Sequence, residues 1–471
     1  MVYQFVNAGS GNDSNSGTSE GAAVATLNQA MVNIIAAAEN GSHLIITDSS
    51  TYTVTNALGG VPSYTGDRLH IMAKTGSDGM PEVSPVLDGG NSNGTGGSVV
   101  AGAIRATYGW VIRGLTFQNY IISSTDDRGA IYVRSISSQP LTIENCVFRH
   151  ITGSAINLSE GTSDPGLHII SQNKFHDINT GGSGSAIVSL GVTSNKKGKI
   201  TNNLFYDWQP FGTNDYIILA NGTRSSETII SHNTFGTSSV EANSGDIYRT
   251  DVAVRSTYSK FEYNIIYEQT SRDVSNSSFA NIDYGEANYN IYYGLSDGNS
   301  DYAPFGKSAA PTASNNNVQA DPLFKGTPNS ALVGPDAVTN SYKLRGTKSP
   351  AFDAAIGSAD VTEDITGGNR IVLDRSALDT GIYDIGCYEL TGLYSTETVG
   401  DLQEYSGDFT INRIPKADDQ NKRALQEGNS DTIGHDVDQV PLTTAINGAL
   451  PAFIRKRPTS NVASSGKKTK G

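Results

Sequence analysis

Three short phrases decide how this chain folds: ISQNKF (Ile170–Phe175), ITNNLF (Ile200–Phe205) and ISHNTF (Ile230–Phe235). They begin thirty residues apart, and each has Asn at its fourth position and Phe at its sixth. Weaker copies, IRGLTF, IENCVF, FEYNII and ANYNIY, begin at Ile112, Ile143, Phe261 and Ala287. A repeat of this length is typical of supersecondary units that stack on one another.

The composition of each repeat selects one kind of stack. Short runs of β-branched and aromatic residues alternate with Gly, Ser, Asn and Asp, and the apolar residues lack helical spacing. This excludes helical solenoids, and a propeller blade needs about 40–50 residues. We therefore predict an all-β chain folded as a parallel β-helix, a solenoid with one coil per repeat. The Ile and Phe columns should point inward and repeat at about 4.8 Å, the spacing of neighbouring strands.

The fourth position of the phrase predicts a ladder of asparagines. Asn tolerates the left-handed backbone conformation that a tight corner needs, and stacked Asn side chains can hydrogen-bond from one corner to the next. Leu115 and Cys146 hold this position in earlier repeats, so the ladder should start after them, with members Asn173, Asn203, Asn233, Asn264 and Asn290. A second inward column is expected at Ile131, Ile156, Ile187, Ile217 and Ile247.

The two ends of the chain differ from the repeats. An open coil exposes apolar core and strand edges, so we expect a capping helix where apolar residues fall at helical spacing, at Leu27, Met31, Ile34, Ile35 and Ala38. After Tyr394 apolar residues are sparse, and the charge changes from acidic to basic beyond Pro451. Such a segment cannot bury enough surface to fold alone, so we expect an extended arm held by a partner or by another copy.

These features divide the chain into four predicted parts. Residues 1–41 form an N-terminal cap, and residues 42–294 form the β-helix repeats. Residues 295–394 form terminal coils and a closing module, and residues 395–471 form the attachment arm.

The composition argues against several classes of partner. The net charge of −14 and the charged fraction of 17% disfavour binding to nucleic acid or to an anionic membrane. No apolar run reaches the roughly 18 residues of a membrane-spanning helix. The first residues lack the basic and apolar regions of a signal peptide. The two cysteines, Cys146 and Cys387, do not make a disulfide framework.

Several motifs resemble the pectate-lyase-like superfamily of right-handed parallel β-helix proteins. The NNLF-type corners and the stretch LDGG…WVIRGLTFQN (Leu87–Asn119) have this resemblance. Four further motifs resemble the closing module of bacterial surface β-helix proteins: ADPLF from Ala320, YKLRGTKSPAFDAA from Tyr342, DITGGNR from Asp364 and DIGCYEL from Asp384. The resemblance covers residues 1–392 and implies a right-handed solenoid. The superfamily includes lyases, glycosidases, adhesins and bacteriophage tail proteins, so it leaves the function open.

Two functions of different classes are therefore expected. The first is a bacteriophage virion surface protein of tailspike, tail-fibre or capsid-decoration type. It would bind host-surface glycan and join virion proteins or other copies through residues 395–471, as a trimer if it is tailspike-like. The alternative is a polysaccharide-degrading enzyme, a lyase or a glycoside hydrolase, secreted or phage-borne. The sequence leaves open whether the chain is an enzyme.

Two pairs of charged residues are candidates for catalysis. Asp177 and Asp207 each lie two residues after the Phe column, so they should sit one coil apart, at about 5 Å, a spacing compatible with a carboxylate pair. Alternatively, both accept backbone N–H groups at turns. Arg249 and Asp251 best match the Arg base and calcium-binding carboxylates that the resemblance implies for lyases; alternatively, they lie on a solvated strand face.

Aromatic residues beside the Phe column are candidates for glycan binding. Flat rings can stack on sugars, but they can equally serve packing; the residues are Tyr206, Trp208, Tyr267 and Tyr293. No cluster of oxygen ligands for calcium is visible, and His and Cys lack metal-ligand spacing. We therefore expect no metal and no cofactor.

Overall fold

The structure is a computed structural model. It describes residues 1–37, 39–58, 68–91, 102–106, 109–122, 129–133, 140–158, 167–179, 186–190, 197–209, 215–220, 228–236, 245–250, 260–267, 286–293, 316–325, 342–345, 349–352, 354–356, 361–368, 370 and 382–389. All of these residues belong to one unit, Met1–Arg370 with Ile382–Glu389. The predicted arm, residues 395–471, lies outside the described residues.

Three sheets, named A, B and C here, form the body of the protein. Sheet A contains, in spatial order, β1 (Tyr3–Val6), β2 (Ser42–Ile46), β4 (Leu69–Ala73), β7 (Val111–Arg113), β10 (Thr142–Glu144), β13 (Leu167–Ser171), β16 (Lys197–Thr201), β19 (Thr228–Ser231), β22 (Lys260–Glu262) and β24 (Glu286–Asn288). Sheet B contains β3 (Thr51–Thr53), β5 (Val86–Asp88), β8 (Thr116–Ile121), β11 (Val147–Thr152), β14 (Lys174–Asn179), β17 (Leu204–Gln209), β20 (Thr234–Phe235), β23 (Ile265–Tyr267), β25 (Ile291–Tyr293) and β26 (Val318–Gln319). Sheet C contains β6 (Ile104–Ala106), β9 (Gly129–Val133), β12 (Ser154–Asn157), β15 (Ala186–Ser189), β18 (Asp215–Ala220) and β21 (Gly245–Thr250).

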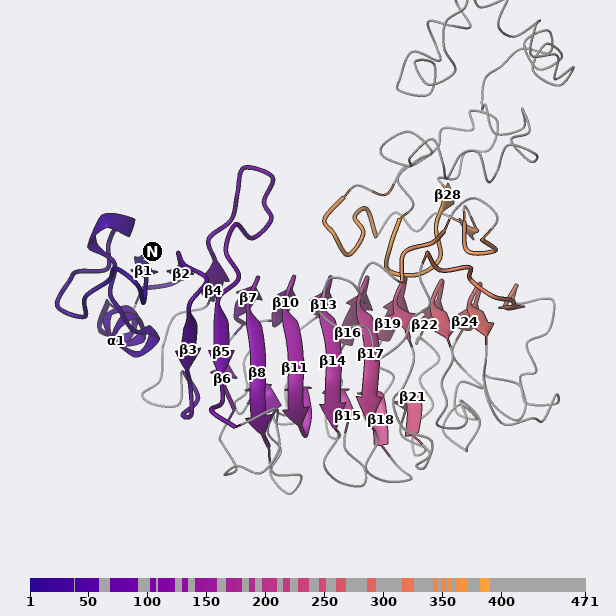
Figure 1. The fold of residues 1–471 in the computed structure, drawn as a ribbon, viewed down its shortest axis with the longest axis horizontal. Coiled ribbons are helices and arrows are strands. Elements are labelled where there is room, and N and C mark those ends of the chain that lie inside the picture. The colour runs from indigo at the N-terminus through magenta and orange to yellow at the C-terminus, as the bar shows by residue number, and fades with distance from the viewer. Residues whose placement is uncertain are drawn as a thin grey trace, which may run out of the picture. The chain divides into compact units, whose positions relative to one another are not determined.

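The chain visits the three sheets in turn. It passes from β10 in sheet A to β11 in sheet B and β12 in sheet C, and it repeats this path with β13, β14 and β15 (Figure 1). The described strands of each sheet pair in parallel with the strands one coil before and after. The chain is therefore a parallel β-helix, as predicted. Two short strands outside it, β27 (Ala355–Ile356) and β28 (Ile382–Tyr383), pair antiparallel.

A helix precedes the coils where the sequence predicts one. After the short 3-10 helix η1 (Glu20–Ala22), α1 runs from Leu27 to Ala37. Thr26 caps the helix start: its Oγ1 accepts the N–H of Gln29 at 3.2 Å, and Asp13 in turn accepts the N–H of Thr26 at 2.9 Å. The buried face of α1 belongs to the same apolar cluster as the coil interior. That α1 closes the solenoid stays a prediction. No helix in the described ranges has the length and apolarity to cross a membrane.

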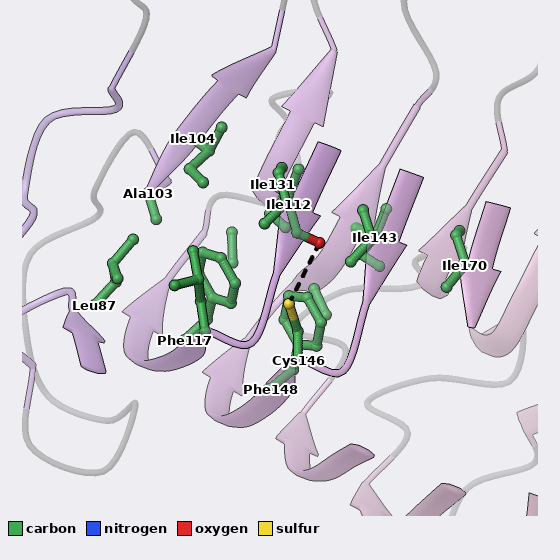
Figure 2. Packing of buried hydrophobic residues seen from close by; sticks show 14 of the residues in the cluster. Leu87, Ala103, Ile104, Ile112, Phe117, Ile131, Ile143, Cys146, Phe148 and Ile170 are labelled. Carbon is green, nitrogen blue, oxygen red and sulfur yellow. Dashed lines mark hydrogen bonds between the residues drawn. The ribbon is translucent and has the colours of Figure 1, made fainter. Parts of the chain in front are cut away.

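The inward columns of the phrase have the predicted register. In sheet B, neighbouring Phe rings stack with centroids 4.6–5.1 Å apart, through Phe117, Phe148, Phe175, Phe205 and Phe235. In sheet A, the Ile column pairs in the same way, as Figure 2 shows for Ile112, Ile143 and Ile170. Each fully buried ring contributes roughly 1.5–3 kcal/mol, so the stack is a main source of stability.

The second Ile column is only partly in the predicted register. Ile131 pairs with Ile156, but Ile156 then pairs with Val188 rather than Ile187. The shift occurs at this step alone: Val188 pairs with Ile218 and Ile218 with Tyr248, which aligns Ile187, Ile217 and Ile247 with one another as predicted. The prediction is wrong at the step from Ile156 because Ile187 and Val188 are both apolar and buried, so burial does not select one register.

The asparagine ladder is present, and it extends one coil beyond the prediction. Asn203 Oδ1 accepts the backbone N–H of Asn173 at 2.9 Å, and Asn233, Asn264 and Asn290 repeat this contact. Asn317 continues it by accepting the N–H of Asn290 at 2.8 Å. At the other end, the Cys146 N–H donates to Asn173 Oδ1. The ladder therefore starts at Asn173, as predicted.

The backbone reason given for the ladder is wrong. The left-handed residue at each corner is the one before the ladder Asn, such as Gln172 (φ 59°) and Asn202 (φ 57°). The ladder Asn residues are instead selected by hydrogen bonding. Asn203 Nδ2 donates to the carbonyls of Ile170 and Thr201 and to Asn233 Oδ1, while the side chain is fully buried.

The described parts of the predicted closing module pack outside the later coils. An apolar cluster joins Tyr206 and Tyr267 of sheet B to Phe324 and Tyr342. Buried Arg370 donates to Asn202 Oδ1 at 2.7 Å and to Glu389 Oε2 at 2.9 Å, with further bonds to the carbonyls of Glu363, Asp384 and Gly386. This guanidinium therefore fastens the DITGGNR and DIGCYEL motifs to a corner of the solenoid.

Replacing Asn203 by Leu should lower the free energy of unfolding by about 1–3 kcal/mol, because buried backbone groups lose their partners. Phe205→Ala should cost about 3–5 kcal/mol, because it removes a ring from the stack and leaves a cavity. Denaturant titration of both variants measures these values. Midpoints equal to that of the wild-type protein would show that neither column supports the fold.

Two histidines form an aromatic stack on the outward face of sheet A. The His43 ring lies between Tyr3, at 4.8 Å, and His70, at 4.2 Å. Burial lowers the pKa of His43. Burial, together with the charges of His43 and Arg68, lowers the pKa of His70 to about 4. The stack is therefore compatible with neutral imidazoles.

This stack should make the protein sensitive to acid. Because the pKa of His70 is 6.5 when unfolded and about 4 when folded, the unfolded chain binds more protons between these values. The contribution of His70 is thus present above about pH 6.5 and is lost as the pH falls toward 4. His70→Phe keeps a ring in the stack, and its thermal midpoint should fall less between pH 7 and 4.5 than that of the wild-type protein. Equal falls would contradict this role.

Candidate functional site

Two columns of polar residues lie next to each other on sheet B. The residue after each inward Phe, and after Leu87 in β5, points outward. These residues pair across the strands in the order Asp88, Gln118, Arg149, His176 and Tyr206. The next residue along each strand has a left-handed backbone: Asn119, His150, Asp177 and Asp207, with φ of 51–61°. This conformation interrupts the strand alternation, so the following residue points inward again.

The two predicted carboxylates lie in neighbouring coils. β14 pairs with β17 so that His176 is opposite Tyr206 and Ile178 is opposite Trp208, which places Asp177 beside Asp207, one coil away. The Asp177 carboxylate also lies 2.6 Å from Nδ1 of His176 and 3.7 Å from Nε2 of His150. Among the described residues, none donates a backbone N–H to Asp177; the alternative in which Asp177 and Asp207 stabilise turns stays open.

Burial by itself raises the pKa of Asp177, but the hydrogen bond with His176, the neighbouring Asp207 and the charges of His176 and His150 outweigh it, so the pKa is lowered. The side chain of Asp177 is 38% exposed. The arrangement can hold one proton on one carboxyl while the other stays ionised.

A polar network continues the site toward the N-terminus. Arg149 donates to Gln118 Oε1 from Nε at 2.9 Å and from Nη2 at 2.7 Å. Gln118 and Asn119 both donate to Asp88 Oδ2, at 2.7 and 2.8 Å. These contacts fix amide, guanidinium and carboxylate groups at successive coils, so the face offers donors and acceptors at regular steps.

Three of the four aromatic candidates for glycan binding are buried, so for them the alternative of packing holds. Trp208 is 1% exposed and lies in the core, in register with Ile178, because left-handed Asp207 turns it inward. Tyr206 and Tyr267 are buried under the closing segments, against Tyr342 and Phe324. Tyr293, at 36% exposure, alone among them is open to solvent.

The lyase candidates are not placed. Asp251 and the side chain of Arg249 lie outside what the structure describes, although the backbone of Arg249 belongs to β21. Within the described residues, no group of three or more His, Cys, Asp or Glu side chains is arranged to hold a metal ion.

Sequence reasoning missed His176 as a member of the site. The ring stacks on Tyr206 with centroids 4.9 Å apart and an interplanar angle of 8°. The position of His176 in the sequence could have revealed it. His176 follows the inward Phe175 and precedes Asp177, so strand alternation places it in the outward column beside the carboxylates.

No protein-family model and no curated protein matches the chain. Among solved structures, pectate lyase Pel9A is similar at 12% sequence identity with a TM-score of 0.42, over 83% of this chain and 96% of that chain. A GH136 lacto-N-biosidase from Eubacterium ramulus is similar at 9% identity with a TM-score of 0.31, over 62% of this chain and 64% of that one. The strand order by itself establishes a parallel β-helix.

Proposed function

We propose that the protein binds a polysaccharide along the outward face of sheet B and hydrolyses it at Asp177 and Asp207. The two neighbouring carboxyls support this best, because glycoside hydrolysis needs one carboxyl that gives a proton and one that is ionised. Asp177 is exposed and Asp207 is partly exposed. His150 precedes them in the same column, and Arg149 lies in the neighbouring column opposite His176.

The repeating face suits a repeating polymer. Each coil adds polar side chains at steps of about 4.8 Å, so an extended glycan can meet donors and acceptors at regular steps along its length. Amide and guanidinium groups that are already fixed by neighbours lose little entropy when a sugar hydroxyl binds them.

The test is a panel of soluble neutral, amino-sugar and uronic acid polysaccharides, assayed for new reducing ends. The wild-type protein should cleave at least one of them, and Asp177→Asn and Asp207→Asn should each lower the rate at least about 100-fold. Asp78→Asn is the matched control, because Asp78 lies in an exposed turn after β4. No cleavage across the panel, or equal rates in all four proteins, would overturn hydrolysis.

The second candidate is a virion surface protein of a bacteriophage that binds host-surface glycan through the same face. The sequence of residues 395–471 favours it, because sparse apolar residues and a change from acidic to basic charge suit an arm that docks on a partner. In this function the arm would join virion proteins or other copies, and the protein would reside on the virion surface. As an enzyme alone it would be secreted.

Removing the chain after Tyr394 should leave a folded body, because Asp384–Glu389 are already buried against the coils. The truncated protein should keep the thermal midpoint of the full chain but fail to join its particle or oligomer. Binding of the full chain should weaken as salt rises, because part of the contact is ionic. Normal assembly of the truncated protein, measured by sedimentation, would refute the arm.

A further inference from the structure

We propose that the protein cleaves its polysaccharide from one end, because the closing segments form a wall across the outward face of sheet B one coil beyond Asp177. The wall consists of Phe324, Tyr342, Gly386 and Cys387, and Tyr342 is the residue that stops the glycan chain. This inference rests on the proposed hydrolysis and adds to it the mode of cleavage. The protein would release a short fragment of fixed size from a chain end.

The outward columns of sheet B change character between two neighbouring coils. In the column before the inward Phe, four successive residues are partly exposed: Val86, Thr116, Val147 and Lys174. The next residue in that column, Leu204, is fully buried. In the column after the Phe, Asp88, Gln118 and Arg149 are partly exposed, whereas Tyr206 is 4% exposed. The face that a glycan can reach therefore ends between β14 and β17.

Tyr342 covers the column after the Phe. The centroid of its ring lies 5.7 Å from that of Tyr206 and 5.3 Å from that of Phe324. Gly236 follows Phe235 one coil after Tyr206, and a Cβ added there would collide with the Tyr342 ring. Because position 236 has no side chain, the Tyr342 ring lies directly on the backbone and takes the space of an outward residue.

The DIGCYEL motif covers the column before the Phe. Thr234 Oγ1 accepts the N–H of Cys387 at 3.2 Å, and a Cβ added at Gly386 would meet Thr234 and Ile265. Thr234 and Ile265 are each 1% exposed. The buried bonds of Arg370 fasten this motif to the solenoid, so the wall is a fixed part of the fold.

The face on the other side of Asp177 is longer. From His176 the column runs back through Arg149, Gln118 and Asp88 to exposed Thr53, four strand steps or about 19 Å. In the opposite direction, a single step of about 4.8 Å separates the coil of Asp177 from that of Tyr206.

This asymmetry determines how a polymer can bind. The long side can hold several sugars of a chain, whereas the short side has room for a fragment only. A polysaccharide that lies along the face therefore reaches Asp177 with its end against Tyr342, and hydrolysis releases the piece between them.

The mode of cleavage is measured on the panel polysaccharide that the wild-type protein cleaves fastest. One short product of fixed size should appear from the first time points, while the viscosity of the solution falls slowly. Tyr342→Ala should give longer products of mixed size, and Tyr3→Ala, which removes an exposed ring on sheet A, is the matched control with wild-type products. Mixed oligosaccharides and an early fall in viscosity with the wild-type protein would overturn the inference and leave hydrolysis intact.

Binding tests the wall without cleavage. Oligosaccharides of each panel polysaccharide, with one bulky fluorophore at either the reducing or the non-reducing end, are titrated with Asp177→Asn, and fluorescence polarisation is measured. A fluorophore on the end that meets Tyr342 should weaken binding at least about tenfold relative to one on the other end. Equal affinity of the two forms would overturn the wall. Unequal affinity without cleavage by the wild-type protein would refute hydrolysis and keep the one-ended face, and absence of both binding and cleavage would refute both.

Discussion

At each corner of the asparagine ladder, a backbone N–H donates a hydrogen bond to the asparagine side chain of the next coil. The rest of this structure depends on this contact. A corner that leaves the strands buries its N–H and C=O groups, and each of these would cost about 1–3 kcal/mol if unsatisfied. Asn173, Asn203 and their successors satisfy both kinds of group with one side chain. Because each Asn bonds to the coil before it, the ladder also fixes how one coil lies on the next.

This register places the functional groups. Once the ladder aligns the corners, Phe175 lies on Phe205, and the residues that follow them align as well. His176 then faces Tyr206, and Asp177 faces Asp207. The two carboxyls are close because of the coil spacing, and no long-range contact has to bring them together.

The closing segments restrict the face that the coils create. Over the later coils they cover the outward side of sheet B, including Tyr206 and Tyr267, with an apolar cluster fastened by Arg370. The polar columns from Asp88 to Asp177 have no described apolar cover of this kind. Tyr342 of the closing segments packs against Tyr206, and Tyr206 in turn stacks on the His176 ring. The packing of the closing segments therefore affects the orientation of a residue in the candidate site.

The sequence by itself determined the β-helix, the Phe stack, the start of the Asn ladder, the helix near the N-terminus and the adjacency of Asp177 and Asp207. These features are encoded by residues one repeat apart, and a solenoid converts that separation into direct contact. Only the tertiary structure decided that Trp208 points inward, that sheet C shifts by one residue after Ile156, and that Tyr342 covers Tyr206. Trp208 points inward because a single left-handed residue before it reverses the strand alternation, which the hydrophobic pattern does not reveal. The register of sheet C is undetermined in the sequence because two adjacent residues are both apolar. The contact of Tyr342 joins segments far apart in the chain, and such contacts have no period in the sequence.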